Sequence, residues 1–169
     1  MRSAIRVCCL AGLLSWVFVP MAVTASADTA WELVVTGREQ APLARISLPD
    51  SGQWCLIWNH SVQGFPVIDC FTISNDQLTL QSTQTPDFAA GLGHISGRGT
   101  LESDSQHGYR IVDMNVPIPD NTLRLRVGSE SVNHRIRTGS RTVSLSHLAA
   151  NQSVEIRLTP AGDKGMKLQ

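Results

Sequence analysis

The sequence predicts an all-β protein, a single antiparallel β-sandwich or flattened barrel of about ten short strands. Short runs of apolar, β-branched and aromatic residues recur at regular spacing, with clusters of Gly, Pro, Asn and Asp between them. After the N-terminal leader, no stretch carries the apolar period of an amphipathic helix. The chain also has no internal repeat.

The N-terminus, residues 1–27, has the pattern of a signal peptide. Arg2 and Arg6 supply a positive n-region, Val7–Val19 an apolar core, and Ala25-Ser26-Ala27 a small-residue cleavage site. The apolar core is shorter than the ~20 residues that a membrane span needs. We therefore expect cleavage and export to the periplasm, with an uncleaved N-terminal anchor as the alternative and no stable span after cleavage.

The mature chain is expected to form one β-sandwich domain over residues 28–159, followed by a loose tail over residues 160–169. The whole sequence has 14 basic and 14 acidic residues, so its formal net charge is zero. Such a chain has no global field to attract nucleic acid or a membrane surface, so charged partners must be sought locally. We expect a monomer that binds no nucleic acid.

The first half of the domain contains four strand signals in order. Trp31–Thr36 is a short apolar run, and Arg45–Leu48 is a second one that ends at a Pro-Asp-Ser-Gly turn. Two further runs, within Gln53–Ile73, flank the tetrad that ends in Gly64. Because glycine accepts the positive φ of a tight turn, these two runs predict a β-hairpin, and Pro66 is tolerated at its strand start.

The second half contains a series of alternating runs that predict strands. We expect Thr122–Val127 and Val132–Arg137 to form a hairpin around Gly128–Ser131. The last two strands, Thr142–Leu148 and Ser153–Leu158, are expected to form a hairpin around Ala149–Gln152. The segment Phe88–Gly99 is rich in glycine and predicts a loop. In chain order the predicted strands are Leu78–Ser82, Tyr109–Met114, Thr122–Val127, Val132–Arg137, Thr142–Leu148 and Ser153–Leu158.

The register of the central hairpin predicts a disulfide. If the turn is centred between Val62 and Gln63, Cys55 lies opposite Cys70. Opposed residues have Cβ atoms ~5 Å apart, close to the spacing that a disulfide spans. We predict a Cys55–Cys70 disulfide, with two buried free thiols as the alternative, whereas Cys8 and Cys9 are expected to leave with the leader.

The same register separates the residues that would otherwise suggest a hydrolase triad. Asp69 lies opposite Leu56, four positions from His60, which is roughly 13 Å along the strand. Ser61 points to the opposite face from His60. We therefore expect His60 and Ser61 to bond to backbone groups and fix the turn rather than to act as catalysts.

Asp69 shares a strand face with apolar residues, where an unpaired carboxylate is costly to bury. We predict a cationic partner for it, either Arg126 or Arg98. The alternative is an aspartate near an exposed end of the sheet.

The second hairpin predicts a basic stripe. If it pairs around Gly128–Ser131, Arg124 lies opposite Arg135, and Arg126 and Arg137 join them on one face. Like charges opposed across a ladder are destabilising, so a bound anion or an acidic partner would relieve them. Four arginines splayed into water are the alternative. His134 falls on the apolar face and is expected to be a buried, hydrogen-bonded histidine.

The glycine-rich loop lacks the lysine and hydroxyl of a P-loop and does not complete a dinucleotide fingerprint. Its backbone amides near Gly91, Gly93 and His94 are candidates for holding a carboxylate or phosphate, with plain packing of small residues as the alternative. The histidines and Asp69 have no metal-ligand spacing, so no metal site and no cofactor are predicted.

The central hairpin resembles the opening motif of the bacterial domain of unknown function 1850. The resemblance rests on Trp58–Val62, on Pro66-Val67 and on the acid at position 69, with later blocks at Phe88–Gly93 and Leu125–Gly128. The chain departs from the family pattern in having Asp69 where glutamate is usual, and Gly93-His94 where a proline is usual. The resemblance implies a small exported protein, often encoded beside the membrane subunits of tripartite ATP-independent periplasmic (TRAP) solute transporters, with no assigned reaction.

Together these observations predict a periplasmic, non-enzymatic protein that associates with TRAP-type membrane subunits or binds a small carboxylate. The expected binding surface combines His60, Ser61, the loop around Gly91, Gly93 and His94, and the arginines at 124, 126 and 135. The alternatives are a hydrolase that uses His60 or His94 and a purely structural envelope protein.

Overall fold

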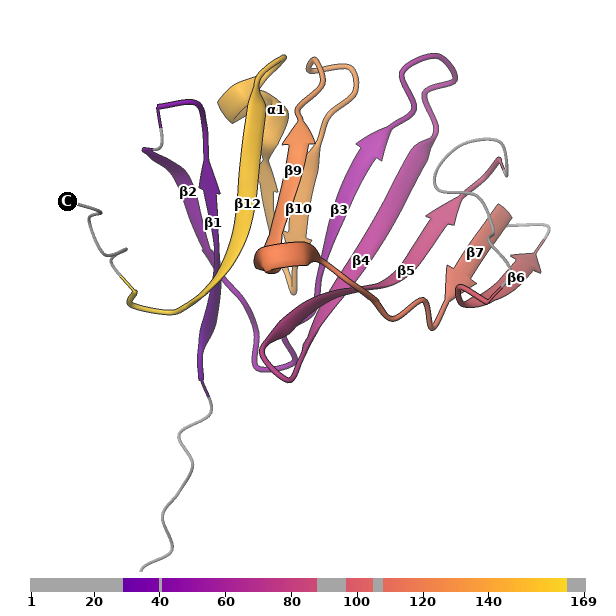
Figure 1. Cartoon of the computed structure of the whole chain (residues 1–169). Helices are drawn as coiled ribbons and strands as arrows, with labels where there is room; N and C mark the ends of the chain where they lie inside the picture. The colour runs from indigo at the N-terminus through magenta and orange to yellow at the C-terminus, as the bar shows by residue number, and fades with distance from the viewer. Residues whose placement is uncertain (1–28, 40, 88–96, 105–107, 164–169) are drawn as a thin grey trace, which may run out of the picture.

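The computed structural model describes residues 29–39, 41–87, 97–104 and 108–163. The predicted signal peptide, with Cys8 and Cys9, lies outside these residues, as do residues 164–169 of the predicted tail. The described strands form two antiparallel sheets that face one another (Figure 1), which confirms the sandwich rather than the barrel alternative.

The smaller sheet has four strands in the order β2-β1-β12-β9. Strands β9 and β12 alternate apolar and polar residues, so one face of the sheet turns to the core and the other to solvent. Leu33 and Val35 of β1 are fully buried on the inner face. The strands are β1 (Trp31–Thr36), β2 (Pro42–Ser47), β9 (Thr122–Arg126) and β12 (Ser153–Pro160).

The larger sheet runs in the order β11-β10-β3-β4-β5-β7-β6, and β8 pairs separately with β5. A 3-10 turn, Pro119–Asn121, connects β8 to the smaller sheet. The strands are β3 (Trp54–Asn59), β4 (Pro66–Ser74), β5 (Gln77–Thr85), β6 (Thr100–Asp104), β7 (Gly108–Val112), β8 (Val116–Pro117), β10 (Arg135–Thr138) and β11 (Arg141–Ser144).

One hydrophobic core lies between the two sheets. Leu33 and Ile156 from the smaller sheet belong to the same buried cluster as Leu56 of the larger sheet. Trp54 and Phe71, which are opposed across β3 and β4, stack with ring centroids 4.4 Å apart. The two sheets therefore depend on each other to remove their apolar faces from water.

The central hairpin has the predicted register. Ile57 pairs with Ile68, and Cys55 pairs with Cys70. These cysteines form the predicted disulfide, with Cα atoms 4.1 Å apart. A short turn links these two strands directly, and such a local connection sets their pairing.

The other two predicted hairpins are wrong. β9 pairs with β12, and β10 pairs with β3 and β11, so the chain crosses from one sheet to the other after β9. The expected last hairpin is replaced by β11 and a short helix, α1 (Leu145–Ala149). Ser144 caps this helix by accepting a hydrogen bond from the backbone N–H of His147. Neither helix in the described part of the chain has the length and apolar content needed to cross a membrane.

Candidate functional site

The outer face of the four-stranded sheet carries most of its charge. Because Leu33 and Val35 point into the core, their neighbours Glu32, Val34 and Thr36 point outward. The pairing of β2, β1 and β12 then places Val34 between Arg45 and Arg157 in one outward row. In the next row, Thr36 pairs with Glu155, which pairs in turn with Arg124.

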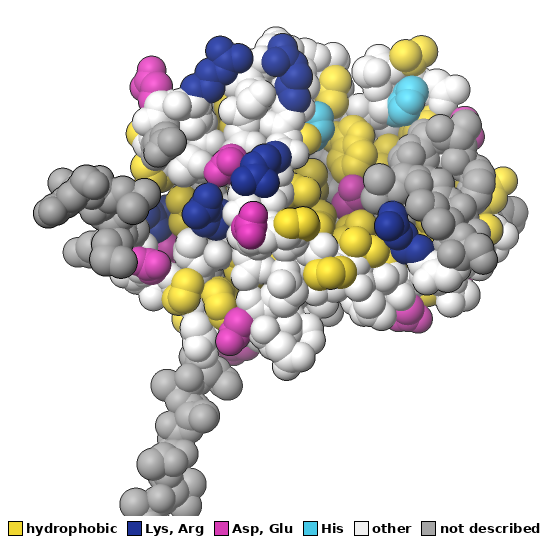
Figure 2. Space-filling model, viewed as in Figure 1, with side chains coloured by type: hydrophobic (Ala, Val, Ile, Leu, Met, Phe, Trp, Pro, Cys, Tyr) yellow, Lys and Arg dark blue, Asp and Glu magenta, His cyan; other side chains and the backbone are white. Residues whose placement is uncertain are grey.

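Five arginines on this side line an open cavity with a volume of about 1010 Å³. Two carboxylates, Glu155 and Asp163, line the same cavity. Figure 2 shows basic and acidic side chains interleaved over the smaller sheet. We refer to the five as the arginine face: Arg38, Arg45, Arg124, Arg126 and Arg157.

Three of these arginines are held by carboxylates. Glu155 accepts from Nε of Arg124 at 3.1 Å and from Nη2 of Arg157 at 3.3 Å, and Glu32 accepts from Arg45. The Arg124 and Arg157 side chains remain 62% and 55% exposed. Ion pairs this exposed contribute little to stability, so they orient the guanidinium groups more than they hold the fold.

The other two arginines of the face have no carboxylate partner within the part of the chain that the structure describes. Arg38 and Arg126 are exposed and take part in no ion pair among the described residues. A guanidinium group presents its N–H donors in a fork that matches a carboxylate or a phosphate. The arginine face therefore combines two unpaired cations with others already fixed in position, an arrangement suited to binding anionic groups.

The predicted basic stripe does not form. Arg124 and Arg126 lie on β9 in the smaller sheet, whereas Arg135 and Arg137 lie on β10 in the larger one. Arg135 instead donates to the carbonyl of Asn133 at 3.0 Å. The error arose because Gly128–Ser131 has the composition of a hairpin turn but serves as a crossover between sheets.

The crossover is fixed by a small polar cluster. The backbone N–H of Gly128 donates to Nδ1 of His134 at 2.9 Å, and the backbone N–H of His134 donates to Oγ of Ser146 at 2.9 Å. Ser146 donates in turn to the carbonyl of Gly128 at 3.1 Å. His134 is 7% exposed and stacks on Trp58, and burial lowers its pKa. The expectation of a buried, hydrogen-bonded histidine is confirmed.

His60 organises the β3–β4 turn. Its Nδ1 accepts from the backbone N–H groups of Val62 and Gln63, at 3.4 and 3.3 Å. Its ring stacks on Phe65 with centroids 5.2 Å apart. The turn-fixing role predicted for His60 is therefore observed, whereas Ser61 is exposed at the tip.

The predicted loop site lies outside the described residues, since Gly91, Gly93 and His94 all fall within residues 88–96. Within the part of the chain that the structure describes, no group of three or more His, Cys, Asp or Glu residues could hold a metal ion.

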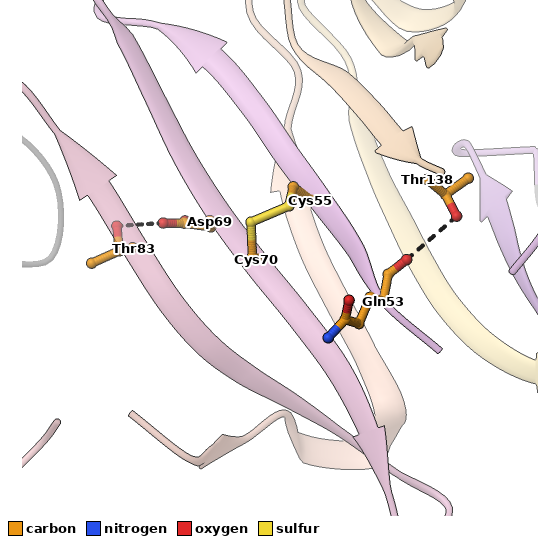
Figure 3. The surroundings of a disulfide bond; sticks show 6 residues. All are labelled: Gln53, Cys55, Asp69, Cys70, Thr83 and Thr138. Atoms are coloured by element: carbon orange, nitrogen blue, oxygen red, sulfur yellow. Dashed lines mark hydrogen bonds between the residues drawn. A yellow bond between two sulfur atoms is a disulfide. The ribbon is translucent and has the colours of Figure 1, made fainter. Parts of the chain in front are cut away.

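Asp69 has a different partner from the one predicted. As Figure 3 shows, the hydroxyl of Thr83 on the neighbouring strand donates to Oδ1 of Asp69 at 2.6 Å. Asp69 is absent from the ion pairs among the described residues, so its predicted pairing with Arg126 or Arg98 is wrong. Arg126 belongs to the other sheet and points to that sheet's outer face, and Arg98 is exposed.

The surroundings of Asp69 change its titration. It occupies an inner-face row of the larger sheet, between Leu56 and Thr83, and Ile111 follows Thr83 in the same row. Burial raises the pKa of Asp69 from 3.8 to about 6, and the hydrogen bond from Thr83 opposes that rise. A carboxylate perturbed in this way is a candidate functional residue as well as a cost to the fold.

Comparison with protein families identifies the chain. A model of the family described as "Domain of unknown function (DUF1850)" matches residues 55–145. The chain belongs to the DUF1850 family. No curated protein and no solved structure matched it.

The residues that match the DUF1850 model include only some of the charged residues described above. The match includes Asp69 and the two arginines of β9, but it ends before Arg157 and begins after Arg38 and Arg45.

The sequence analysis did not predict Arg38, Arg45 or Arg157 as site residues. Alternation was a usable signal for two of them, because Arg45 and Arg157 each sit between apolar residues of a strand.

Proposed function

We propose that this DUF1850 protein is an exported, non-enzymatic binding module that recognises anionic groups through the arginine face. The observation that carries the proposal is the cavity lined by five arginines, two of which have no ion pair among the described residues. Carboxylates and phosphates are the groups that such guanidinium clusters bind most strongly.

The family resemblance supplies the setting. Relatives encoded beside TRAP-type membrane subunits suggest an accessory role in solute transport, and the signal-peptide pattern of residues 1–27 supports a periplasmic location. In that setting, the anionic group belongs either to a transported carboxylate or to a transporter subunit.

The contacts of His60 favour this binding role over a hydrolase that uses His60, whereas His94, the other histidine of that alternative, lies outside the described residues. A hydrolase would need a carboxylate or a serine hydroxyl within hydrogen-bond reach of the imidazole. Nδ1 of His60 instead faces two backbone N–H groups of its own turn. The purely structural alternative differs from ours in predicting no response to any anion.

Thermal unfolding in the presence of small dicarboxylates tests anion binding. Succinate should raise the melting temperature, because a ligand that binds the folded state stabilises it by mass action. Succinamide, its neutral diamide, should not. Arg126→Glu should abolish the succinate response, whereas Arg137→Glu, on the outer face of the other sheet, should retain it. Equal responses from both variants would contradict a site on the arginine face.

Co-purification tests the transport setting separately. Tagged protein, isolated under mild detergent from cells that also express a TRAP membrane subunit, should retain that subunit. If the subunit is not enriched over an unrelated exported protein, the accessory role is contradicted, while anion binding stands on its own test.

A further inference from the structure

Strand β9 is an edge of the smaller sheet. It pairs with β12 on one side, and no strand pairs with its other side among the described residues. An unpaired edge presents a row of backbone N–H and C=O groups to which another extended segment can bond.

The hydrogen-bond phase of the sheet shows which groups of β9 face outward. The backbone N–H of Val127 donates to the carbonyl of Gln152, directly opposite in the β9–β12 register. Hydrogen-bonded pairs alternate along an antiparallel ladder, so Leu125 and Leu123 also bond to β12. The backbone N–H and C=O groups of Arg124 and Arg126 therefore point to the free edge.

The hydrogen bonds between β12 and β1 lead to the same assignment of which β9 backbone groups are free. The backbone N–H of Ala161 donates to the carbonyl of Ala30, in line with the β1–β12 register. By alternation, Glu155 and Arg157 then bond to β1, which leaves Val154 and Ile156 to bond to β9.

The free backbone groups and the exposed cations of β9 thus belong to the same two residues. Both arginine side chains are exposed, and Arg126 has no ion pair among the described residues. Pairing of β9 with β9 of a second copy would oppose arginine to arginine, which destabilises a ladder. The charge on this edge therefore disfavours self-pairing and favours an acidic partner.

We propose that β9 accepts an extended acidic segment of a partner protein as an added strand of the smaller sheet. The inference rests on the proposed anion-binding function and specifies the partner's form. Main-chain hydrogen bonds to Arg124 and Arg126 supply affinity, and carboxylates opposite these two side chains supply specificity. The openness of the arginine face suits a strand lying along the sheet better than a small solute, which pockets normally enclose.

Synthetic peptides test the inference. The probe is a fluorescein-labelled decapeptide of alternating glutamate and threonine, and binding is measured by fluorescence anisotropy. A glutamate opposite Arg124 or Arg126 shares its face and directs its own N–H to that arginine's carbonyl. N-methylation of the glutamates should therefore weaken binding about tenfold or more, whereas N-methylation of the threonines should change it little.

Protein variants locate the edge. The double variant Arg124→Glu/Arg126→Glu should lose peptide binding, and Arg137→Glu, within an internal strand, should retain it. Circular dichroism of each variant, compared with the parent, verifies folding. Peptide binding retained by the double variant would overturn the inference.

The outcomes separate this inference from the proposed function. If both methylated peptides bind equally, or if succinate raises the melting temperature but no peptide binds, strand addition is overturned and anion recognition stands. If neither succinate nor the peptide binds, both are overturned.

Edge strand β6 carries Glu102, so a second copy of the chain could be the occupant of the β9 edge, and sedimentation velocity checks for it. Self-association lost on Glu102→Arg would assign the β9 edge to that copy instead.

Discussion

Asp69 places a carboxylate on the inner face of the larger sheet, in a row with Leu56 and Ile111. A single hydroxyl, from Thr83, is its hydrogen-bond donor among the described side chains. Burial of a charge with so little compensation costs folding free energy. Natural proteins commonly retain such costs at sites of function, so this cost marks Asp69 as a candidate functional residue.

Replacement of Asp69 by asparagine should stabilise the protein at neutral pH. The folded pKa of about 6 lies above the ordinary value of 3.8, so between these values the folded state binds more protons than the unfolded state. The free energy of unfolding therefore falls as pH rises through this window, by about 1–3 kcal/mol from this group. We expect Asp69→Asn to exceed the parent by this amount at pH 8 in urea unfolding, and the difference to shrink at pH 4.

Thr83 provides the matched control for Asp69. Its hydrogen bond lowers the pKa of the carboxyl group, so Thr83→Val should raise that pKa further. Titration of the Asp69 carboxyl carbon by NMR measures this directly. A stability difference between Asp69→Asn and the parent that is independent of pH would contradict the assignment of the raised pKa.

The Cys55–Cys70 disulfide should contribute measurably to stability. It closes a loop with a sequence separation of 15, for which the reduction in unfolded-chain entropy is worth about 3 kcal/mol. We expect the Cys55→Ala/Cys70→Ala variant to lose about 2–4 kcal/mol in guanidinium unfolding, and the reduced parent to behave similarly. Thiol labelling of the unreduced, unfolded mature protein should find no free thiol, and two reactive thiols would contradict the bond.

At the scale of elements, sequence reasoning succeeded where pairing is local and failed where it is not. The β3–β4 register follows from a short turn that ends in Gly64, because adjacent strands have little choice of partner. The turn after β9 looks equally local, yet Val132 and Asn133 bond back to Ser129 while the chain crosses between sheets. Turn composition alone does not distinguish a hairpin from such a crossover.

The polar cluster at this crossover should be sensitive to Ser146. Its hydroxyl accepts from His134 and donates to Gly128, and the side chain is 1% exposed. Ser146→Ala would leave the buried N–H of His134 without that acceptor, at a cost of about 1–3 kcal/mol. Ser61→Ala, at an exposed turn position, is the control and should change the free energy of unfolding by less than about 0.5 kcal/mol. Equal effects of the two variants would contradict a structural role for the cluster.

At the scale of the molecule, the arginine face could be predicted only in part. Alternation along β9 indicated that Arg124 and Arg126 share a face, and this is observed. Their neighbours Arg45 and Arg157 come from strands distant in the sequence. Which strands meet in a sheet depends on how the whole core is buried, and the alternation of one strand contains no such information.

The extent of the family match leads to a final prediction about the whole fold. Residues 55–145 omit β1, β2 and β12, three of the four strands of the smaller sheet. These strands bury six aliphatic side chains at 0–4% exposure, namely Leu33, Val35, Ile46, Val154, Ile156 and Leu158. At about 1.5–3 kcal/mol for each buried side chain, their loss is comparable to the ~5–15 kcal/mol by which domains are stable.

A fragment of residues 55–145 should therefore not fold alone, whereas residues 29–163 should. We expect poor amide dispersion in the NMR spectrum and no cooperative urea transition for the short fragment, and both features for the longer one. Leu33→Ala in the longer chain is the intermediate case, with a loss of about 2–5 kcal/mol. A cooperative transition in the short fragment would show that the larger sheet is stable by itself. In that case the smaller sheet, with its arginine face, would be an addition to the DUF1850 core rather than half of it.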